Sequence, residues 1–370
     1  MTLDVRKMLF IYRISADAPH RGRYRYRTVY LWICSPTSAK DIKLKLKGYE
    51  KCEWEYTKQV SREGPDGTTE WDTVQGKVKG DKTFFKTEFK LVEYHDGIPI
   101  GHYAYPFQYT LQQEIPGSFR MKGKTDHSNS NEWEGNVKYK VKAAMEARDG
   151  KLKVTQPLVI RTDARTQVNQ SETHEKEGTV RLCCCIPRGT VKLQARLDSN
   201  VYEAGSTARI HVNVDNDSSV DIDHFVLKLM QVIHLQGKDD DSHSERRVSL
   251  TDTVCESKYD GCKSGDKKEC DIELVLKTGD GHEIQPTTKG GHIKCTYHID
   301  IEMQVSWCPD IEIHAPIILT APSNNWWQQW AAPQWLVNCQ PVPIQGPCAV
   351  PQPVMDSHTF SNIPGFGPPL

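Results

Sequence analysis

The chain has 370 residues, a length that predicts two domains at roughly 100–200 residues per domain. Its 47 basic and 48 acidic residues give a formal net charge of −1, which argues against a nucleic-acid partner. Twelve cysteines fall below the density of a disulfide scaffold, and no stretch approaches the roughly 20 apolar residues of a membrane span.

The N-terminal stretch does not look like a secretory signal. Its apolar run, Met8 to Tyr12, is short and has charged residues close to both ends. We therefore expect a cytoplasmic protein whose cysteines are reduced thiols, because disulfide bonds are rare in the cytosol.

The first half of the chain alternates apolar and polar residues with a period of two, which is typical of strands with one buried face. The clearest segment is Asp41 to Trp54, in which Ile42, Leu44 and Leu46 alternate with lysines. The strands expected in this half are Arg23 to Cys34, Asp41 to Trp54, Thr83 to Tyr94, Tyr103 to Gln112, Val137 to Met145 and Lys153 to Ile160.

Two polar stretches of this half predict long loops. One runs from Ser61 to Asp72 and contains Gly and Pro, and the other runs from Met121 to Glu134. A turn is expected at 114–118, which contains Pro116 and Gly117.

The second half shows the strand pattern most clearly between Thr190 and Gln231. Apolar residues two apart define three strands, and turn-forming residues separate them. These apolar sets are Val191, Leu193, Ala195 and Leu197; Ile210, Val212 and Val214; and Phe225, Leu227 and Leu229. A sheet with one apolar face needs a second sheet to cover it, so the pattern predicts a β-sandwich.

We therefore predict an all-β chain of two tandem immunoglobulin-like β-sandwiches followed by a disordered tail. The first sandwich is expected at 1–161, a linker at 162–188, the second sandwich at 189–322 and the tail at 323–370. The first part of the linker, Thr162 to Gly178, is polar and almost free of aliphatic residues, and hinge motion is expected there. The tail is rich in Pro, Gln and Asn, and Asp356 is its single charged residue.

Short motifs in a fixed order extend over both halves. They are YPFQY at 105–109, EIPGSF at 114–119, VKYKVKA at 137–143, CCC at 183–185 with the strand from Val191 to Ala204, GHIKCTYHI at 291–299, WCPDIE at 307–312 and PIIL at 316–319. Their order and spacing over about residues 20–322 resemble the arrestin family, and most closely its α-arrestin (arrestin domain-containing) branch.

The resemblance implies two arrestin-like sandwiches and a non-catalytic adaptor in protein trafficking. Members of the family bind membrane-protein cargo, such as receptor or transporter tails, and link it to ubiquitin ligases or endocytic adaptors. It further implies a cytoplasmic protein that is recruited to the plasma membrane or endosomes and associates peripherally with membranes. A structural subunit of a retromer-like sorting coat has the same two sandwiches and is the alternative.

In one respect the chain departs from the branch. α-Arrestins commonly carry Pro-Pro-x-Tyr motifs in the tail, which bind WW domains of ubiquitin ligases. The only Pro-Pro pair here is Pro368-Pro369, and Leu370 follows it. Recruitment of a ligase would therefore need another route.

Arginines two apart precede and enter the first long strand. Arg21, Arg23, Arg25 and Arg27 would share one strand face, where guanidinium groups bind phosphates or acidic tails with paired hydrogen bonds. In the family, basic residues of the N-terminal domain contact phosphorylated cargo tails. A solvated strand face without a ligand is the alternative.

Arg161 resembles the arginine of the buried charged cluster that senses phosphate in visual and β-arrestins. Its acidic partner would be Asp280, in the corresponding loop of the second half. α-Arrestins generally lack this cluster, so a surface arginine at the end of a strand is the alternative.

Three adjacent cysteines, Cys183, Cys184 and Cys185, suggest a lipidation site. A metal site is disfavoured, because adjacent cysteines do not easily bind one zinc ion and the chain has no C-x-x-C pair. The main alternative, also for Cys255, Cys262 and Cys270, is buried thiols that act as small apolar residues.

Four tryptophans stand out in the tail: Trp326, Trp327, Trp330 and Trp335. Large aromatic side chains are unfavourable when left in water, so we expect them either to dock on the sandwiches or to anchor a partner.

No group of residues indicates catalysis. The sequence has no H-E-x-x-H, G-x-S-x-G or Walker motif, and His211, His298 and His314 are scattered over alternating strands. We expect no enzymatic activity, no cofactor and no metal.

Overall fold

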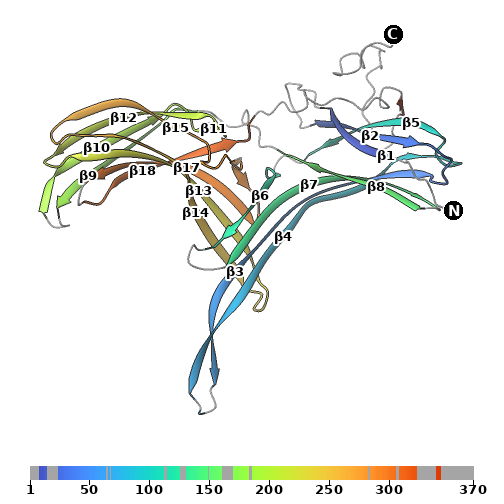
Figure 1. Cartoon of the computed structure of the whole chain (residues 1–370), viewed down its shortest axis with the longest axis horizontal. Helices are drawn as coiled ribbons and strands as arrows, with labels where there is room; N and C mark the ends of the chain where they lie inside the picture. The colour runs from blue at the N-terminus through green and yellow to red at the C-terminus, as the bar shows by residue number, and fades with distance from the viewer. Residues whose placement is uncertain are drawn as a thin grey trace, which may run out of the picture.

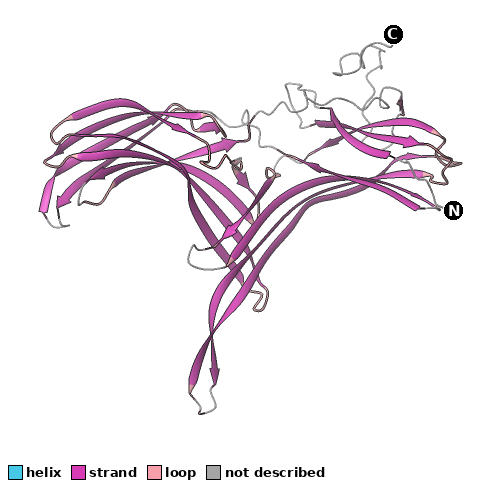
Figure 2. Cartoon of the chain, in the orientation of Figure 1, coloured by secondary structure: helices cyan, strands magenta, loops and turns pink. Residues whose placement is uncertain are grey.

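The computed structural model describes residues 8–14, 24–63, 66, 68–111, 115–125, 131–148, 150–160, 170–182, 186–281, 284–305, 308–322 and 339–342. Of residues 8–14, 24–27, 108, 110, 182, 340 and 341 it describes the backbone alone. Every regular element in this part of the chain is a β-strand (Figure 2). Among these residues there is no helix long and apolar enough to cross a membrane. The all-β prediction is confirmed.

Strands β3 and β4 are the longest, with 23 and 25 residues. In chain order the strands are β1 Met8–Ile14, β2 Tyr24–Ile33, β3 Asp41–Glu63, β4 Thr69–Glu93, β5 Gly101–Thr110, β6 Phe119–Lys124, β7 Glu132–Ala147, β8 Gly150–Leu158, β9 Glu172–Leu182, β10 Ile186–Leu197, β11 Val201–Glu203, β12 Thr207–Ser218, β13 Ile222–Asp239, β14 Glu245–Cys262, β15 Lys267–Val275, β16 Thr288–Lys289, β17 Ile293–Val305, β18 Ile311–Thr320 and β19 Gln340–Pro341.

The strands form two β-sandwiches in tandem, and one sheet runs through both (Figure 1). In the N-terminal sandwich, β1-β2-β5-β19 packs over a layer with β4, β3, β7 and β8. In the C-terminal sandwich, β15-β12-β10-β9 packs over a layer with β13, β17 and β18. The second layers meet where β13 pairs with β4, and this pairing joins them into one 11-stranded sheet of the described strands.

The predicted apolar faces fill both cores. In the N-terminal sandwich, Ile42, Leu44 and Leu46 of β3 are buried, as are Val29 and Leu31 of β2. In the C-terminal sandwich, the alternating apolar residues of β10, β12 and β13 are all buried. Each such aliphatic side chain contributes about 1.5–3 kcal/mol when fully buried, so the period-two pattern accounts for both the strands and their packing.

The loop predicted for Ser61 to Asp72 is wrong. Strands β3 and β4 stay paired as far as Glu63 and Thr69, so that a two-stranded hairpin projects beyond both sandwiches (Figure 1). Both faces of the hairpin are exposed, and therefore it has no apolar alternation from which a strand would be predicted. The loop predicted for Met121 to Glu134 is likewise shortened by β6 and β7.

The linker predicted for 162–188 contains a strand. β9, Glu172–Leu182, pairs along its whole length with β10 at the edge of a sheet. Among the β9 residues whose side chains are described, Val180 is the only core residue, and the others are polar or exposed. An edge strand needs few apolar residues, which explains why composition suggested a linker and a hinge.

The tail adds a short strand to the N-terminal sandwich. β19 lies parallel to β5, with Gln340 opposite Tyr103 and Pro341 opposite Ala104. The Val342 N–H donates a 2.8 Å hydrogen bond to the carbonyl of Ala104. The expectation of a disordered tail did not include this contact, because a two-residue strand leaves no pattern in the sequence.

Cys339, directly before β19, provides a test of this contact. Burial raises the pKa of its thiol to about 11, and the thiolate is the form that reacts with alkylating agents. We expect iodoacetamide to modify Cys339 at least about tenfold more slowly than the exposed Cys34. Peptide mass spectrometry measures both rates in one sample, and equal rates would contradict the docked tail.

Candidate functional site

The outer face of the N-terminal sandwich, formed by β4, β3, β7 and β8, is covered with lysines. Alternate residues of each strand point away from the core, because the residues between them are buried. We define this lysine face as Lys43, Lys45, Lys47, Lys86, Lys90, Lys138, Lys140, Lys142, Lys151 and Lys153. In Figure 1 it belongs to the layer from which the β3–β4 hairpin projects.

The register of the strands brings these lysines side by side. Lys47 of β3 lies opposite Lys140 of β7 on one side and Lys86 of β4 on the other. Lys45 lies opposite Lys142 in the same way. Residues opposite one another on a sheet have Cβ atoms about 4.5–5.5 Å apart, and like charges in such pairs repel. An anion bound on this face would relieve that repulsion.

Few carboxylates neutralise the lysine face. Lys45 pairs with Glu88 at 2.8 Å, and Lys90 pairs with Glu93 at 2.7 Å; Lys151 pairs with Glu146. No described carboxylate forms an ion pair with the other lysines of the face, which are Lys43, Lys47, Lys86, Lys138, Lys140, Lys142 and Lys153. The face therefore has an excess of positive charge although the whole chain is almost neutral.

The effect of this charge is visible at Glu88. Its hydrogen bond with the Lys45 ammonium lowers the pKa of the Glu88 carboxyl, and the nearby Lys43 and Lys86 lower it further. The aromatic ring of Tyr49 lies among these lysines. The Lys47 Nζ is 4.8 Å and the Lys140 Nζ is 5.5 Å from the Tyr49 ring centroid. Such cation–π contacts hold lysines of two strands around one aromatic residue.

The projecting β3–β4 hairpin carries a separate exposed apolar surface, away from the lysine face. The Trp71 side chain is 63% exposed, and Val60 and Val74 are also exposed. Single exposed apolar residues are common, but a tryptophan on a projecting two-stranded ribbon is well placed to contact a partner.

The two sandwiches meet at a junction built on β4 and β13. Their backbones pair at Lys79 with Lys238 and at Val78 with Asp239, and the Asp240 N–H donates a 2.9 Å hydrogen bond to the carbonyl of Lys77. These contacts fix how the lysine face is oriented relative to the C-terminal sandwich.

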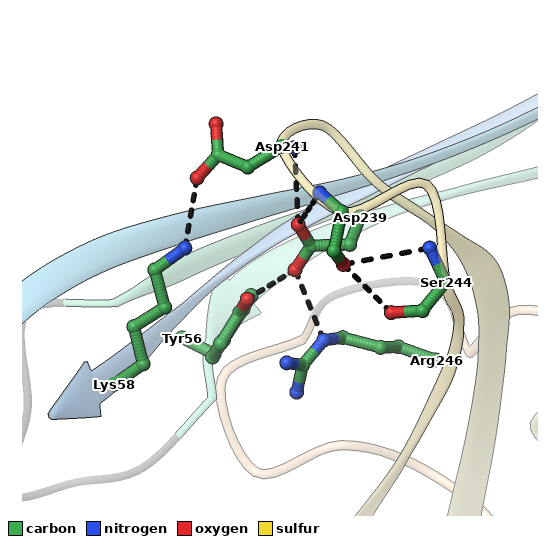
Figure 3. A network of polar contacts seen from close by, with 7 residues as sticks. Tyr56, Lys58, Asp239, Asp241, Ser244 and Arg246 are labelled. Atoms are coloured by element: carbon green, nitrogen blue, oxygen red, sulfur yellow. Dashed lines mark hydrogen bonds and ion pairs between the residues drawn. The ribbon is translucent and has the colours of Figure 1, made fainter. Parts of the chain in front are cut away.

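Asp239 is the centre of this junction (Figure 3). Its side chain is only 1% exposed and accepts hydrogen bonds from the backbone N–H of Ser242 at 2.9 Å, from the Tyr56 hydroxyl and from Arg246 Nε at 3.0 Å. The hydrogen bonds from the Ser242 N–H and then the Tyr56 hydroxyl hold the pKa of Asp239 well below its ordinary value. The Arg246 guanidinium also lies 4.0 Å from the Tyr56 ring centroid.

Two ion pairs flank Asp239. Lys58 contacts Asp241 at 2.8 Å, and Lys79 contacts Asp240 at 2.6 Å. In both pairs, the lysine belongs to the N-terminal sandwich and the carboxylate to the turn after β13. These two ion pairs and the hydrogen bond from Tyr56 to Asp239 join residues more than 160 positions apart in the sequence.

Glu50 forms a second polar contact across the junction. Its side chain is fully buried, and Oε1 accepts hydrogen bonds from the backbone N–H groups of Gly291 and His292, both at 2.9 Å. His292 Nδ1 in turn lies 2.8 Å from the carbonyl oxygen of Gln236, to which it donates. β3, β13 and the segment before β17 are thus locked together.

The close approach of β4 and β13 requires a glycine at position 237. A Cβ there would lie 2.6 Å from the carbonyl oxygen of Lys79, which is backbone and not free to move. We expect Gly237→Ala to lower the free energy of unfolding by about 1–3 kcal/mol and to speed amide exchange at Asp240. Gly279→Ala is the control, because a Cβ at Gly279 has no neighbour within 4 Å. Equal exchange in both variants would contradict this geometry.

The basic strand predicted from sequence is only partly described. Arg25 and Arg27 lie in β2, where their backbones pair with Tyr109 and Phe107 of β5. The other predicted site residues lie outside the described residues: Arg21, Arg23 and Arg161, the cysteines 183–185, and Trp326, Trp327, Trp330 and Trp335. Asp280, the partner considered for Arg161, is described and lines a surface pocket with Arg120.

The lysine face was missed, although the sequence holds its signal. Two stretches, KLKLK at 43–47 and KYKVK at 138–142, place lysines two apart in strands that were themselves predicted. The sequence pattern does not show that β3 pairs with β7, which lies about ninety residues further along the chain. Without that register the two rows of lysines have no common face.

Eight cysteines lie in the described part of the chain. Cys52, Cys262 and Cys295 are buried, and Cys255 and Cys270 are half-buried. Burial raises the pKa of the Cys295 thiol to about 11. The prediction that cysteines near strand ends pack as small apolar residues is confirmed for Cys262 and in part for Cys255 and Cys270.

Comparison with known proteins agrees with this architecture. Residues 28–177 match the arrestin (or S-antigen) N-terminal domain, and residues 187–324 match the arrestin (or S-antigen) C-terminal domain. The order of the two matches is the order of the two sandwiches.

Three curated relatives illustrate the similarity. The chain is 25% identical over 304 residues to arrestin domain-containing protein A of Dictyostelium discoideum, a match that covers 80% of this chain and 48% of that protein. It is 20% identical over 263 residues to arrestin domain-containing protein 15 of Caenorhabditis elegans, covering 69% and 67%. It is 21% identical over 297 residues to human arrestin domain-containing protein 1, covering 78% and 62%.

The chain thus spans about half the length of the Dictyostelium relative. Both halves of the arrestin architecture are nevertheless present, in order and joined by one continuous sheet. This protein belongs to the arrestin family, and its relatives are arrestin domain-containing proteins of the α-arrestin type.

Proposed function

We propose that this chain is a non-catalytic adaptor in protein trafficking. It binds acidic or phosphorylated cytoplasmic tails of membrane proteins and links this cargo to ubiquitin ligases or endocytic machinery. The family supports the general role, since arrestin-domain proteins are generally trafficking adaptors.

The lysine face is the observation that supports cargo binding most directly. It offers rows of ammonium groups on a paired sheet, and most of them have no carboxylate partner among the described residues. Lysine binds phosphate as a compact point charge, and hydrogen bonds from charged donors are about twice as strong as neutral ones. An extended tail with several phosphates or carboxylates matches such a row.

In this proposal, other regions of the chain bind the second partner that an adaptor links to its cargo. The tryptophans of the tail anchor a ligase or an endocytic partner. Arg21, Arg23, Arg25 and Arg27 extend the basic surface, and a lipid on Cys183, Cys184 or Cys185 would assist recruitment to the plasma membrane or endosomes.

The test is a binding titration with the full chain. A fluorescent peptide with a cluster of phosphoserines is compared with its unphosphorylated form and with a neutral scrambled peptide. We expect saturable binding of the phosphorylated peptide that weakens as salt rises, because exposed charges are screened over about 10 Å at 0.1 M salt. Equal binding of all three peptides would overturn the proposal.

A structural coat subunit is the alternative, and it makes a different prediction. Such a subunit would purify in fixed stoichiometry with the same partners and resist salt, whereas an adaptor would release its cargo. Size-exclusion chromatography of the purified assembly at low and high salt distinguishes the two.

A further inference from the structure

Two histidines and an aspartate converge on the outer face of the C-terminal sandwich. Asp300 Oδ1 lies 3.2 Å from His298 Nε2 and 2.6 Å from His314 Nδ1. All three ligand atoms lie within 4.8 Å of one another. We propose that His298, Asp300 and His314 bind a divalent transition-metal ion such as Zn²⁺, independently of the lysine face and of the adaptor function.

The strands hold these side chains in place. His298 and Asp300 are two residues apart on β17, so they share a face, and Asp300 lies opposite His314 of the neighbouring β18. Asp300 is only 6% exposed, whereas the His314 side chain is 53% exposed. The buried Asp300 carboxylate is therefore held in place by the sheet, and an ion reaches it from the solvent side, past His314.

Neighbouring carboxylates have separate roles. Glu312 Oε1 lies 3.5 Å from His314 Nε2, the ring nitrogen that does not face Asp300. A carboxylate on the far nitrogen is the usual means of orienting a metal-binding histidine and raising its basicity. Glu302 is not a ligand in this proposal, because Lys228 Nζ occupies both of its oxygens at 2.6 and 2.7 Å.

The ligand chemistry selects the ion. Imidazole nitrogens favour zinc and related transition metals, whereas Mg²⁺ and Ca²⁺ prefer oxygen ligands. Zinc bonds of about 2.0–2.2 Å require ligand atoms somewhat closer than the present maximum of 4.8 Å. Side-chain rotation of the exposed His314 supplies this movement, and water completes the tetrahedron. The bound ion would cross-link β17 and β18.

The experiment uses the full chain without a polyhistidine tag, stripped of metal by a chelator and kept reduced. Titration with ZnCl₂ is followed by calorimetry for the wild type, His298→Gln, His314→Gln and His211→Gln. His211 is the matched control: it lies 2.9 Å from Glu269 and 2.8 Å from Asp271 but belongs to no metal-binding group of three among the described residues. Zinc binding by cysteine thiols is common to all four proteins and cancels in the comparison.

We expect His298→Gln and His314→Gln each to lose one equivalent of zinc that the wild type and His211→Gln retain. Glu312→Gln should lower the affinity for this equivalent of zinc about tenfold, which is the low end of the effect of an orienting carboxylate. Titration with Co²⁺ gives a second readout. Co²⁺ bound by histidine and carboxylate absorbs visible light without a thiolate charge-transfer band, and we expect both site variants to lose this absorption. Identical zinc isotherms in the wild type and both site variants would overturn the proposal, as would an equal loss in His211→Gln. Because His314 is exposed, His314→Gln keeps the test valid if His298→Gln does not fold.

Discussion

Replacing Glu50 with alanine is expected to lower the free energy of unfolding by about 1–3 kcal/mol, because it removes the charged acceptor of two part-buried backbone N–H groups. The carboxylate is fully buried and accepts from Gly291 and His292, which belong to the other sandwich. Urea denaturation monitored by fluorescence measures the loss. Amide exchange at Gly291 and His292 should accelerate at the same time, since those two N–H groups lose their acceptor.

Glu50→Gln is the matched control. Only Oε1 of Glu50 accepts these two hydrogen bonds, and Oε2 has no partner among the described residues. Glutamine keeps one carbonyl oxygen, so we expect it to retain most of the stability that alanine removes. If the alanine and glutamine variants lose the same free energy of unfolding, the hydrogen bonds of Glu50 are not what stabilises the junction.

Charge reversal on the lysine face is expected to abolish most binding of a phosphorylated peptide. The variant combines Lys47→Glu, Lys140→Glu and Lys142→Glu. Exposed ion pairs contribute up to about 1 kcal/mol each, and reversal adds repulsion, so the affinity should fall on the order of 100-fold. Fluorescence anisotropy with the phosphoserine peptide measures the change. Neither strand should unfold, because these side chains point away from the core.

A second triple variant separates the local effect from the change in net charge. Lys258, Lys277 and Lys294 are exposed lysines of the C-terminal sandwich, and changing all three to glutamate alters the formal charge by the same amount. We expect this control to bind nearly as well as the wild type. Equal weakening in the two triple variants would mean that overall charge, rather than the lysine face, attracts the peptide.

Local patterns were sufficient to predict the strands of both cores. Val191, Leu193, Ala195 and Leu197 alternate because they face a second sheet, and a period of two is visible within a few residues. The β3–β4 hairpin had no such pattern, since neither of its faces is covered. The same holds for β9, an edge strand in which Val180 is the one core residue among the side chains that are described.

The candidate sites depend on contacts between distant residues, which no local pattern records. Tyr56 and Asp239 are separated by 183 positions and meet only because β4 pairs with β13. The lysines of 43–47 and 138–142 were each visible in the sequence, but their common face requires the register of β3 with β7. His298 and His314 were likewise noticed as scattered histidines, and the pairing of β17 with β18 places them around Asp300.

The adaptor account is tested most directly by proximity labelling in living cells. The full chain is compared with the triple variant of the lysine face and with the triple control variant. The account predicts that the wild type and the control label transmembrane proteins, and that the lysine-face variant loses them while it stays folded. If all three label the same small set of coat subunits and no transmembrane cargo, the chain is a structural subunit and the adaptor account is wrong.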